Sequence, residues 1–262
     1  MIRRAAYAIL LAAAISAALR LAAPFMGGDT AAHAYTLMCL RQMLAWGVPA
    51  LLMRPVIRDV VREPEKGINM FAAALAMLVG VAAQYVLPLV TSAVQQWLSS
   101  SPATLPMPSD GLEWVLGILA LVIVPAVTEE CFFRGGVQRS LMADGWGMTG
   151  VFLTAAIFAG MHTSMAGFPA QFAVGCLLGM TMLSVQNLTP CIMLHVAYNA
   201  MALVWTVFPV QRSMVGVVLA LAVLAAYIVW MCRQGWQPAR QKRLPCWTLV
   251  LAAAVAILVR LI

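Results

Sequence analysis

Two adjacent acids, Glu129 and Glu130, lie at the end of a long apolar stretch, and Arg134 follows one helical turn later. An ionisable side chain at the centre of a bilayer costs about 3 kcal/mol or more, so it is rarely found there without a partner or a water-filled cavity. His162 and His195 lie in later apolar stretches. A carboxylate can take a proton from water, and a histidine can assist proton transfer or donate to an oxyanion. These residue types therefore suggest a hydrolytic site inside a membrane.

The segment from Asp144 to Gly147 predicts where two of these side chains meet. Two glycines and an aspartate interrupt the apolar pattern there, which is typical of a turn between helices. Glu129 precedes this turn, and His162 follows it, by nearly the same number of residues. At 1.5 Å per residue both positions are roughly 24 Å from the turn. An antiparallel hairpin therefore places Glu129 and His162 at the same depth on neighbouring helices.

The two acids cannot share one face of a helix, because adjacent residues are separated by about 100° around its axis. Arg134 is four residues after Glu130, which is the spacing of a helical ion pair with the acid on the N-terminal side. We therefore expect Glu130 to pair with Arg134 and Glu129 to point into a cavity. A carboxylate in such a cavity can serve as the general base that activates water.

Two further pairs have the spacing of one helical turn. Phe158 and His162 form the first pair, and His195 and Asn199 form the second, so each pair can present one face to a common point. A histidine and an asparagine amide can stabilise the oxyanion formed at a peptide carbonyl. His195 follows Pro190 closely, so we expect the site to open toward the cytoplasmic side of the membrane.

The elements that position these residues are predicted to be transmembrane helices. The chain is 63% hydrophobic and only 10% charged, whereas soluble domains are about 25% charged. The fold class expected is all-α, a polytopic bundle of about eight or nine helices forming a single integral membrane domain over residues 1–262, with a catalytic core at about 112–208. The expected helices are Arg4–Ala23, Tyr35–Met53, Ile68–Val90, Leu112–Met142, Met148–Met165, Gly167–Gln186, Pro190–Phe208, Met214–Cys232 and Cys246–Ile262.

The distribution of the net charge of +7 indicates how the helices are oriented in the membrane and does not indicate a nucleic-acid partner. If the helices alternate in direction, twelve of the sixteen Lys and Arg residues fall on one side, including those of the segment from Arg54 to Lys66. The long loop from Thr91 to Gly111 on the other side has none. The positive-inside bias then predicts a cytoplasmic N-terminus. We expect a multi-pass protein of a bacterial cell membrane, in contact with lipid.

No metal or other cofactor is predicted. The six cysteines are scattered and form no C-x-x-C pair, so a thiolate zinc site is not indicated. One alternative remains open, a zinc-dependent membrane protease in which Glu129, His162 and His195 hold the metal. The H-E-x-x-H helix signature is absent, however, and the three ligands would come from separate helices.

Three motifs in this order resemble a known family. They are Glu129-Glu130-x-x-x-Arg134, Phe158-x-x-x-His162 and His195-x-x-x-Asn199. They are similar to the E-E-x-x-x-R, F-x-x-x-H and H-x-x-x-N motifs of the CPBP intramembrane proteases, which include the CAAX-processing type II endopeptidases and the Abi proteins. The resemblance covers about residues 112–208. It implies a helical intramembrane glutamic endopeptidase in which Glu129 activates water with His162, His195 and Asn199 form the oxyanion site, and Glu130 and Arg134 support them.

The function expected is hydrolysis of membrane-associated or lipidated peptides. A second alternative belongs to another class, a non-catalytic membrane scaffold or immunity protein that binds a partner through the same polar cavity. The intact motifs favour the enzyme. The last two helices and the first 110 residues carry no motif of this kind, so they do not identify the substrate.

Overall fold

The computed structural model describes residues 2–28, 30–62, 70–99, 107–162, 164–209, 211–234, 250 and 252–257. Within these ranges the protein is helical and contains no β-strand, which confirms the predicted all-α class. The elements are α1 (Ile2–Ala22), η1 (Ala23–Phe25), α2 (Ala31–Gln42), η2 (Met43–Gly47), α3 (Val48–Leu52), α4 (Arg54–Arg62), α5 (Met70–Trp97), α6 (Gly111–Ile118), η3 (Leu119–Ile123), α7 (Val124–Glu130), η4 (Cys131–Gln138), α8 (Arg139–Ala143), α9 (Gly147–Gly160), α10 (Phe168–Val185), α11 (Leu188–Val207) and α12 (Met214–Arg233).

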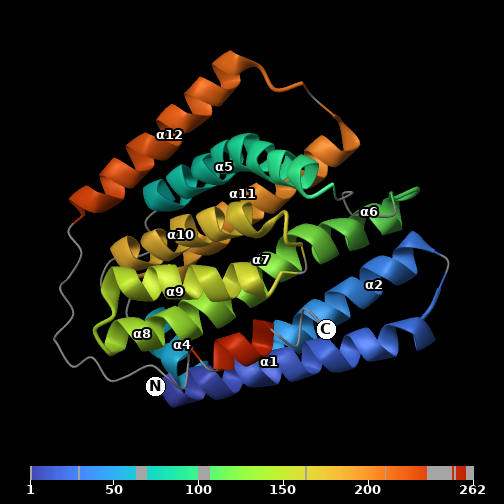
Figure 1. Cartoon of the computed structure of the whole chain (residues 1–262), viewed down its shortest axis with the longest axis horizontal. Helices are drawn as coiled ribbons and strands as arrows, with labels where there is room; N and C mark the ends of the chain where they lie inside the picture. The colour runs from blue at the N-terminus through green and yellow to red at the C-terminus, as the bar shows by residue number, and fades with distance from the viewer. Residues whose placement is uncertain are drawn as a thin grey trace.

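Several of these elements are parts of longer continuous helices. The segments η2, η3 and η4 have π-helical geometry and occur without a break between α-helical segments. One helix therefore runs from Ala31 to Leu52, and another from Gly111 to Ala143. In Figure 1 the long helices lie side by side and run back and forth along the longest dimension of the molecule. The helices α5, α11 and α12 lie on one side of the bundle and α1 and α2 on the other, with α7 and α9 between them.

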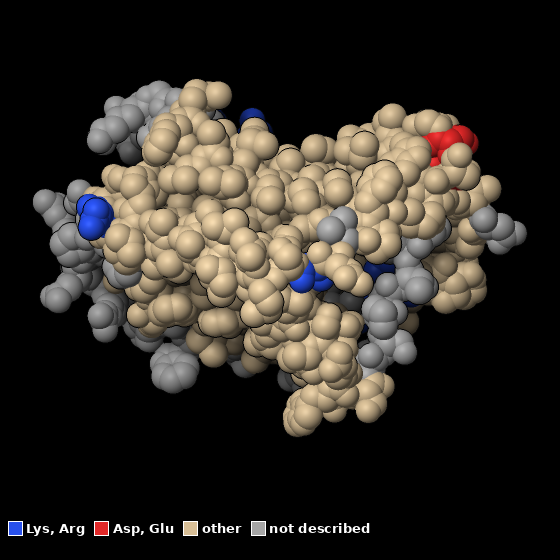
Figure 2. Space-filling view, turned by 90° about the horizontal axis from the view of Figure 1, so that it is seen from above, with Lys and Arg blue, Asp and Glu red and all other residues tan. Residues whose placement is uncertain are grey.

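The described residues contain six helices that are long and apolar enough to cross a membrane. They are Ile2–Phe25, Met70–Trp97, Gly111–Ala143, Phe168–Val185, Leu188–Val207 and Met214–Arg233. Their outer surfaces carry many exposed large hydrophobic side chains, as expected where lipid replaces water as the solvent. The face shown in Figure 2 carries only a few charged side chains. The protein is therefore an integral, multi-pass membrane protein.

The structure differs from the expected helices at several boundaries. The helix expected at Met148–Met165 ends at Gly160 and is too short to be counted as a span. The helix expected to stop at Val90 continues through Pro88 to Trp97, because a proline in a membrane helix is tolerated where neighbouring groups compensate. The segment between the helices expected at Tyr35–Met53 and Ile68–Val90 is itself helical from Arg54 to Arg62. The helix expected at Cys246–Ile262 lies largely outside the described residues.

The predicted turn between α8 and α9 is confirmed. Gly145 has a φ of 88°, a left-handed conformation that suits glycine. Its amide donates to the carbonyl of Met142 at 3.0 Å, and the amide of Trp146 donates to that of Leu141 at 3.0 Å. These bonds satisfy carbonyls at the end of the helix. The turn sends α9 back along the long helix that carries the acids.

Gly80 is a point of close contact between α5 and α11. A Cβ added at Gly80 would collide with the backbone oxygen of Leu194 and would lie 3.0 Å from the amide nitrogen of Tyr198. His195 is next to Leu194, so any shift of α11 at this contact also moves the histidine. The absence of a side chain at Gly80 is thus linked directly to the position of a candidate functional residue.

We expect Gly80→Ala to destabilise the protein by about 1–3 kcal/mol, the usual cost of overpacking a tight contact, and to reduce activity. Thermal unfolding in detergent and peptide cleavage measure the two effects. Gly111→Ala is the matched control, because a Cβ there would have no atom within 4 Å. Equal unfolding midpoints for Gly80→Ala and Gly111→Ala would contradict the close contact.

Candidate active site

The two acids occupy the last two positions of α7, immediately before the π-helical segment η4. Glu129 is 3% exposed, and Glu130 is fully buried. A π-helical turn within an α-helix is uncommon and is often found at functional sites, because it changes the directions in which nearby side chains point. The geometry of this long helix therefore changes directly after the two carboxylates.

Glu130 is held by two cationic or hydrogen-bonding partners. Arg134 donates to its Oε1 at 3.0 Å, so the predicted ion pair is confirmed. Nδ1 of His195, on α11, donates to the same oxygen at 2.8 Å. The three side chains are buried. Glu130 therefore neutralises one buried guanidinium and fixes the orientation of the His195 ring.

Arg134 has further partners on two other helices. Its second terminal nitrogen donates to the carbonyl oxygen of Gly175 at 3.1 Å. Its guanidinium carbon lies 4.7 Å from the ring centroid of Phe158, within the range of a cation–π contact. A Cβ added at Gly175 would lie 3.1 Å from that of Ala155, so this glycine also allows α9 and α10 to approach closely. Arg134 thus ties α7, α9 and α10 together around the acids.

Glu129 has a different environment from Glu130. Its Oε1 accepts a hydrogen bond from Nε2 of Gln42, on α2, at 3.2 Å. Its Oε2 is buried and has no hydrogen-bond partner among the described residues. Nε2 of His195 lies 4.0 Å from Oε2, too far for a direct hydrogen bond. One carboxylate oxygen is therefore fixed by Gln42, and the other has no hydrogen bond from the described residues.

His162 lies just beyond the end of α9 rather than within the predicted helix. The amide of His162 donates to the carbonyl of Ala159 at 3.1 Å, which closes the last turn. Its Nδ1 donates to the carbonyl of Phe158 at 2.8 Å, and the two rings are 4.6 Å apart. A neutral ring that donates from Nδ1 carries its lone pair on Nε2. His162 is thereby oriented with a basic nitrogen.

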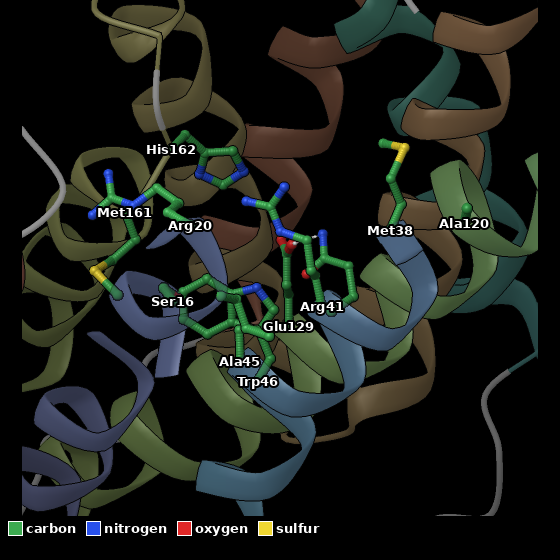
Figure 3. Close-up of a pocket in the computed structure, with 12 residues that line it drawn as sticks. Ser16, Arg20, Met38, Arg41, Ala45, Trp46, Ala120, Glu129, Met161 and His162 are labelled. Atoms are coloured by element: carbon green, nitrogen blue, oxygen red, sulfur yellow. Dashed lines mark hydrogen bonds between the residues drawn. The ribbon is translucent and has the colours of Figure 1, made fainter. Parts of the chain in front are cut away.

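Glu129 and His162 line one cavity of about 290 Å³. Figure 3 shows both side chains directed toward it. Much of the remaining wall comes from the first two helices of the chain. The other lining residues are Ser16, Leu19, Arg20, Met38, Arg41, Gln42, Ala45, Trp46, Ala120 and Met161. The cavity extends to Arg20 in the last turn of α1, so its lining does not favour the expected opening at the end that carries the N-terminus.

Asn199 is not brought into this cavity. It lines a second, smaller cavity of about 150 Å³ together with Tyr35 and Leu121. Four residues of helix rise about 6 Å, so Asn199 lies one turn farther along α11 than His195 and meets other neighbours. The structure therefore brings together Glu129, Glu130, Arg134, Phe158, His162 and His195, whereas Asn199 lies beside them on a separate cavity.

Sequence reasoning missed Gln42 and Gln138. Gln42 contacts Glu129 from a helix that carries no family motif. Gln138 is fully buried and donates to the carbonyl oxygen of Gly179 at 2.7 Å. It repeats, one turn later, the contact of Arg134 with Gly175. The available signal was the same in both cases, a polar side chain within an otherwise apolar helix.

The zinc alternative requires Glu129, His162 and His195 to surround one metal ion. Within the described ranges, no group of three or more His, Cys, Asp or Glu side chains is arranged to hold a metal ion. Glu129 and His195 are 4.0 Å apart at their nearest charged atoms, while the other nitrogen of His195 is bonded to Glu130. The described geometry is that of a hydrogen-bonded network.

A family model described as type II CAAX prenyl endopeptidase Rce1-like matches residues 111–201. This segment is similar to that family. The match confirms the family resemblance inferred from the three motifs, all of which lie inside it. It supports a CAAX-type membrane protease in general. No curated protein and no solved structure matches the chain.

The match to the Rce1-like family begins at the start of α6 and ends within α11. It therefore includes both acids and both histidines of the network. The residues of α1, α2 and η2 that line the cavity lie outside it. The matched segment supplies the acid and base groups, and the preceding helices supply much of the wall that faces them.

Proposed function

We propose that the protein is an intramembrane endopeptidase that hydrolyses peptide bonds of membrane-associated or lipidated peptides with a water activated by Glu129. The observation that carries the proposal is the cavity that Glu129 and His162 line together. One carboxylate oxygen of Glu129 also has no hydrogen-bond partner within the described part of the chain. A glutamate so placed can take a proton from water. The Rce1-like match supports the same reaction class.

The proposed reaction begins with a water between Glu129 and His162. Oε2 of Glu129 takes one proton from it, while Nε2 of His162 accepts a hydrogen bond from the other hydrogen. The hydroxide oxygen forms a bond to the carbonyl carbon of the substrate, and the carbonyl oxygen becomes an oxyanion. The protonated Glu129 then gives its proton to the departing nitrogen, and the C–N bond breaks. The products are a carboxylic acid and an amine.

The remaining groups have supporting roles in this proposal. His195 donates to Glu130 through Nδ1, and its Nε2 faces the reacting region. Protonated at both nitrogens, it can donate to the oxyanion. The role of Asn199 as a second donor rests on the motif alone, because the structure places it on the neighbouring cavity. Glu130 and Arg134 hold His195 and the turn of α7 in place.

We also propose that the N-terminal end of the bundle faces the cytoplasm. In Figure 1, α4, α8 and the end of α12 lie at the same end of the molecule as the N-terminus. Helix ends there carry Arg54, Arg139 and Arg233. A concentration of arginine at one end is typical of the cytoplasmic side.

Metal dependence separates the proposed reaction from the zinc alternative. Purified protein in detergent is incubated with a panel of quenched fluorescent peptides, lipidated and unlipidated, with and without a chelator. We expect cleavage to survive chelation, because the proposed base is a carboxylate and no step uses a metal. Activity that is lost to the chelator and restored by zinc would instead favour zinc bound by Glu129, His162 and His195.

A further inference from the structure

Gln42 gives the carboxylate of Glu129 a hydrogen bond from outside the segment that matches the family model. Its Nε2 donates to Oε1 of Glu129 at 3.2 Å, and Figure 3 marks this bond by a dashed line. Gln42 is the last residue of α2, whereas the matched segment covers residues 111–201. Both side chains line the cavity that His162 also lines. An amide from the N-terminal part of the chain therefore contacts the proposed base at the wall of the cavity.

The carboxylate of Glu129 needs such a contact to keep one orientation. The last torsion of a glutamate side chain is broad and roughly two-fold, so staggering alone does not fix the plane of the two oxygens. The carboxylate of Glu130 is held by Arg134 at 3.0 Å and by His195 at 2.8 Å. Among the described residues, Oε1 of Glu129 accepts from Gln42, and Oε2 accepts from none. Gln42 thus orients Glu129 as Arg134 and His195 orient its neighbour.

The helices that carry Gln42 and Glu129 are packed against each other just beyond this contact. Both change to π-helical geometry there, α2 into η2 directly after Gln42 and α7 into η4 directly after the second acid. The ring of Trp46, in η2, packs against the rings of Phe132 and Phe133, in η4, at centroid distances of 5.5 and 5.1 Å. The three rings are buried. The position of the amide relative to the acid is therefore set by large aromatic side chains.

A second contact holds the other end of α2. Oε1 of Glu113, in the first turn of α6, accepts from the amide of Ala32 at 3.1 Å. Its Oε2 accepts from the amide and the hydroxyl of Ser109, both at 2.7 Å. The long helix that carries the acids is thus joined to α2 on both sides of Gln42. The glutamine therefore approaches Glu129 from a fixed backbone.

The partner of Gln42 distinguishes it from a glutamine that only joins two helices. Gln138 makes such a joining contact, because its amide donates to the backbone carbonyl of Gly179. The amide of Gln42 instead donates to a side chain that lines the cavity. It occupies Oε1 of Glu129 and leaves Oε2, which lies 4.0 Å from Nε2 of His195. One oxygen is therefore used for orientation, and the other remains to take a proton.

We propose that Gln42 is a positioning residue, whose amide holds the carboxylate of Glu129 so that Oε2 is presented to water. This inference rests on the proposed peptidase function and extends its active site to α2, outside the segment that matches the family model. A reacting group displaced by about 1 Å can lose about 10²-fold in rate. Because Gln42 acts through Glu129, its removal costs at most what removal of the base costs.

The variant Gln42→Met tests this role, because methionine has a similar length but no N–H donor. We expect kcat for cleavage of a quenched peptide to fall by about 10–100-fold, with KM within about twofold of wild type and little change in the unfolding midpoint. Gln42→His should recover part of kcat, since its ring can again donate to the carboxylate. Gln95→Met is the matched control, because it changes a half-buried glutamine of α5 outside the lining of the cavity.

Equal kcat values for Gln42→Met and Gln95→Met would overturn the proposal. A loss in Gln42→Met that appears as a raised KM or a lowered unfolding midpoint, with kcat unchanged, would also overturn it. The glutamine would then contribute to substrate binding or to helix packing rather than to the orientation of the base.

The same substitution in a Glu129→Asp background shows whether Gln42 acts through the acid. Aspartate is one methylene shorter, so its carboxylate no longer reaches the amide at 3.2 Å. We therefore expect Gln42→Met to lower kcat by less than about threefold in this background, a non-additive result typical of two residues in contact. An equal fold-loss in both backgrounds would show that Gln42 acts elsewhere and would overturn the proposal.

The Glu129→Gln protein, measured beside these variants, separates failure of this inference from failure of the proposed function. Loss of turnover in Glu129→Gln with normal kcat in Gln42→Met overturns the role of Gln42 and leaves the proposed function standing. Undiminished cleavage by Glu129→Gln overturns both, because there is then no base for Gln42 to orient. Loss of kcat in both variants, with KM preserved in Gln42→Met, supports both.

Discussion

Replacing Glu129 by glutamine is expected to lower kcat for peptide cleavage by about 10²–10⁴-fold, the usual contribution of a general base. Glutamine has nearly the same shape as glutamate, and its side-chain oxygen can still accept the hydrogen bond that Gln42 donates at 3.2 Å. It cannot take a proton from water. The thermal unfolding midpoint should therefore stay close to that of wild type while turnover collapses. Cleavage of a quenched peptide and unfolding in detergent measure both quantities on one preparation.

Two comparisons make this result specific. Glu129→Asp keeps the base but withdraws it by one methylene, so it should retain more activity than Glu129→Gln. His162→Gln should reduce turnover less than Glu129→Gln if the histidine only orients the water. Undiminished cleavage by Glu129→Gln would exclude the mechanism. A cellular phenotype that survives both Glu129→Ala and His162→Ala would favour the scaffold or immunity alternative.

The parts of the site that depend on local spacing could be predicted from the sequence. The pairing of Glu130 with Arg134 follows from four residues on one helix, and the structure has it at 3.0 Å. The turn at Gly145 follows from residues that interrupt an apolar pattern. The membrane class follows from composition alone. Each of these inferences needs only residues that are near one another in the chain.

Contacts between distant segments could not be predicted in this way. Gln42 and Glu129 are 87 positions apart, and nothing in either segment indicates that α2 packs against α7. Asn199 lines a second cavity, and His195 lines neither cavity, so the predicted role of Asn199 as an oxyanion donor stays a prediction.

Two parts of the chain therefore meet at the cavity, and only one of them matches a family model. The acids and histidines lie in the segment that matches the Rce1-like family. Arg20, Arg41 and Gln42 lie in the preceding helices, where no motif was found. A reaction class can be inferred from the first group. We expect substrate preference to depend on the second group, because its side chains form much of the wall of the cavity.

The buried ion pair gives the largest expected effect on stability. Arg134→Met is expected to destabilise the protein by about 3–5 kcal/mol, because it leaves Glu130 as an uncompensated buried charge. It also removes the hydrogen bond to Gly175 and the contact with Phe158. The double variant Glu130→Gln/Arg134→Met should be more stable than Arg134→Met alone, since no unpaired charge is then buried. Chemical or thermal unfolding of wild type, Glu130→Gln, Arg134→Met and the double variant completes this double-mutant cycle.

This cycle also tests whether the pair acts on the chemistry through His195. Nδ1 of His195 donates to the same oxygen of Glu130 that Arg134 contacts. In the double variant, the neutral glutamine can still accept this bond but no longer stabilises a charged ring. Cleavage should therefore stay low even where stability recovers. A double variant with both stability and turnover restored would show that the pair only holds the helices together. Arg134→Met with an unchanged unfolding midpoint would contradict the burial of the charge itself.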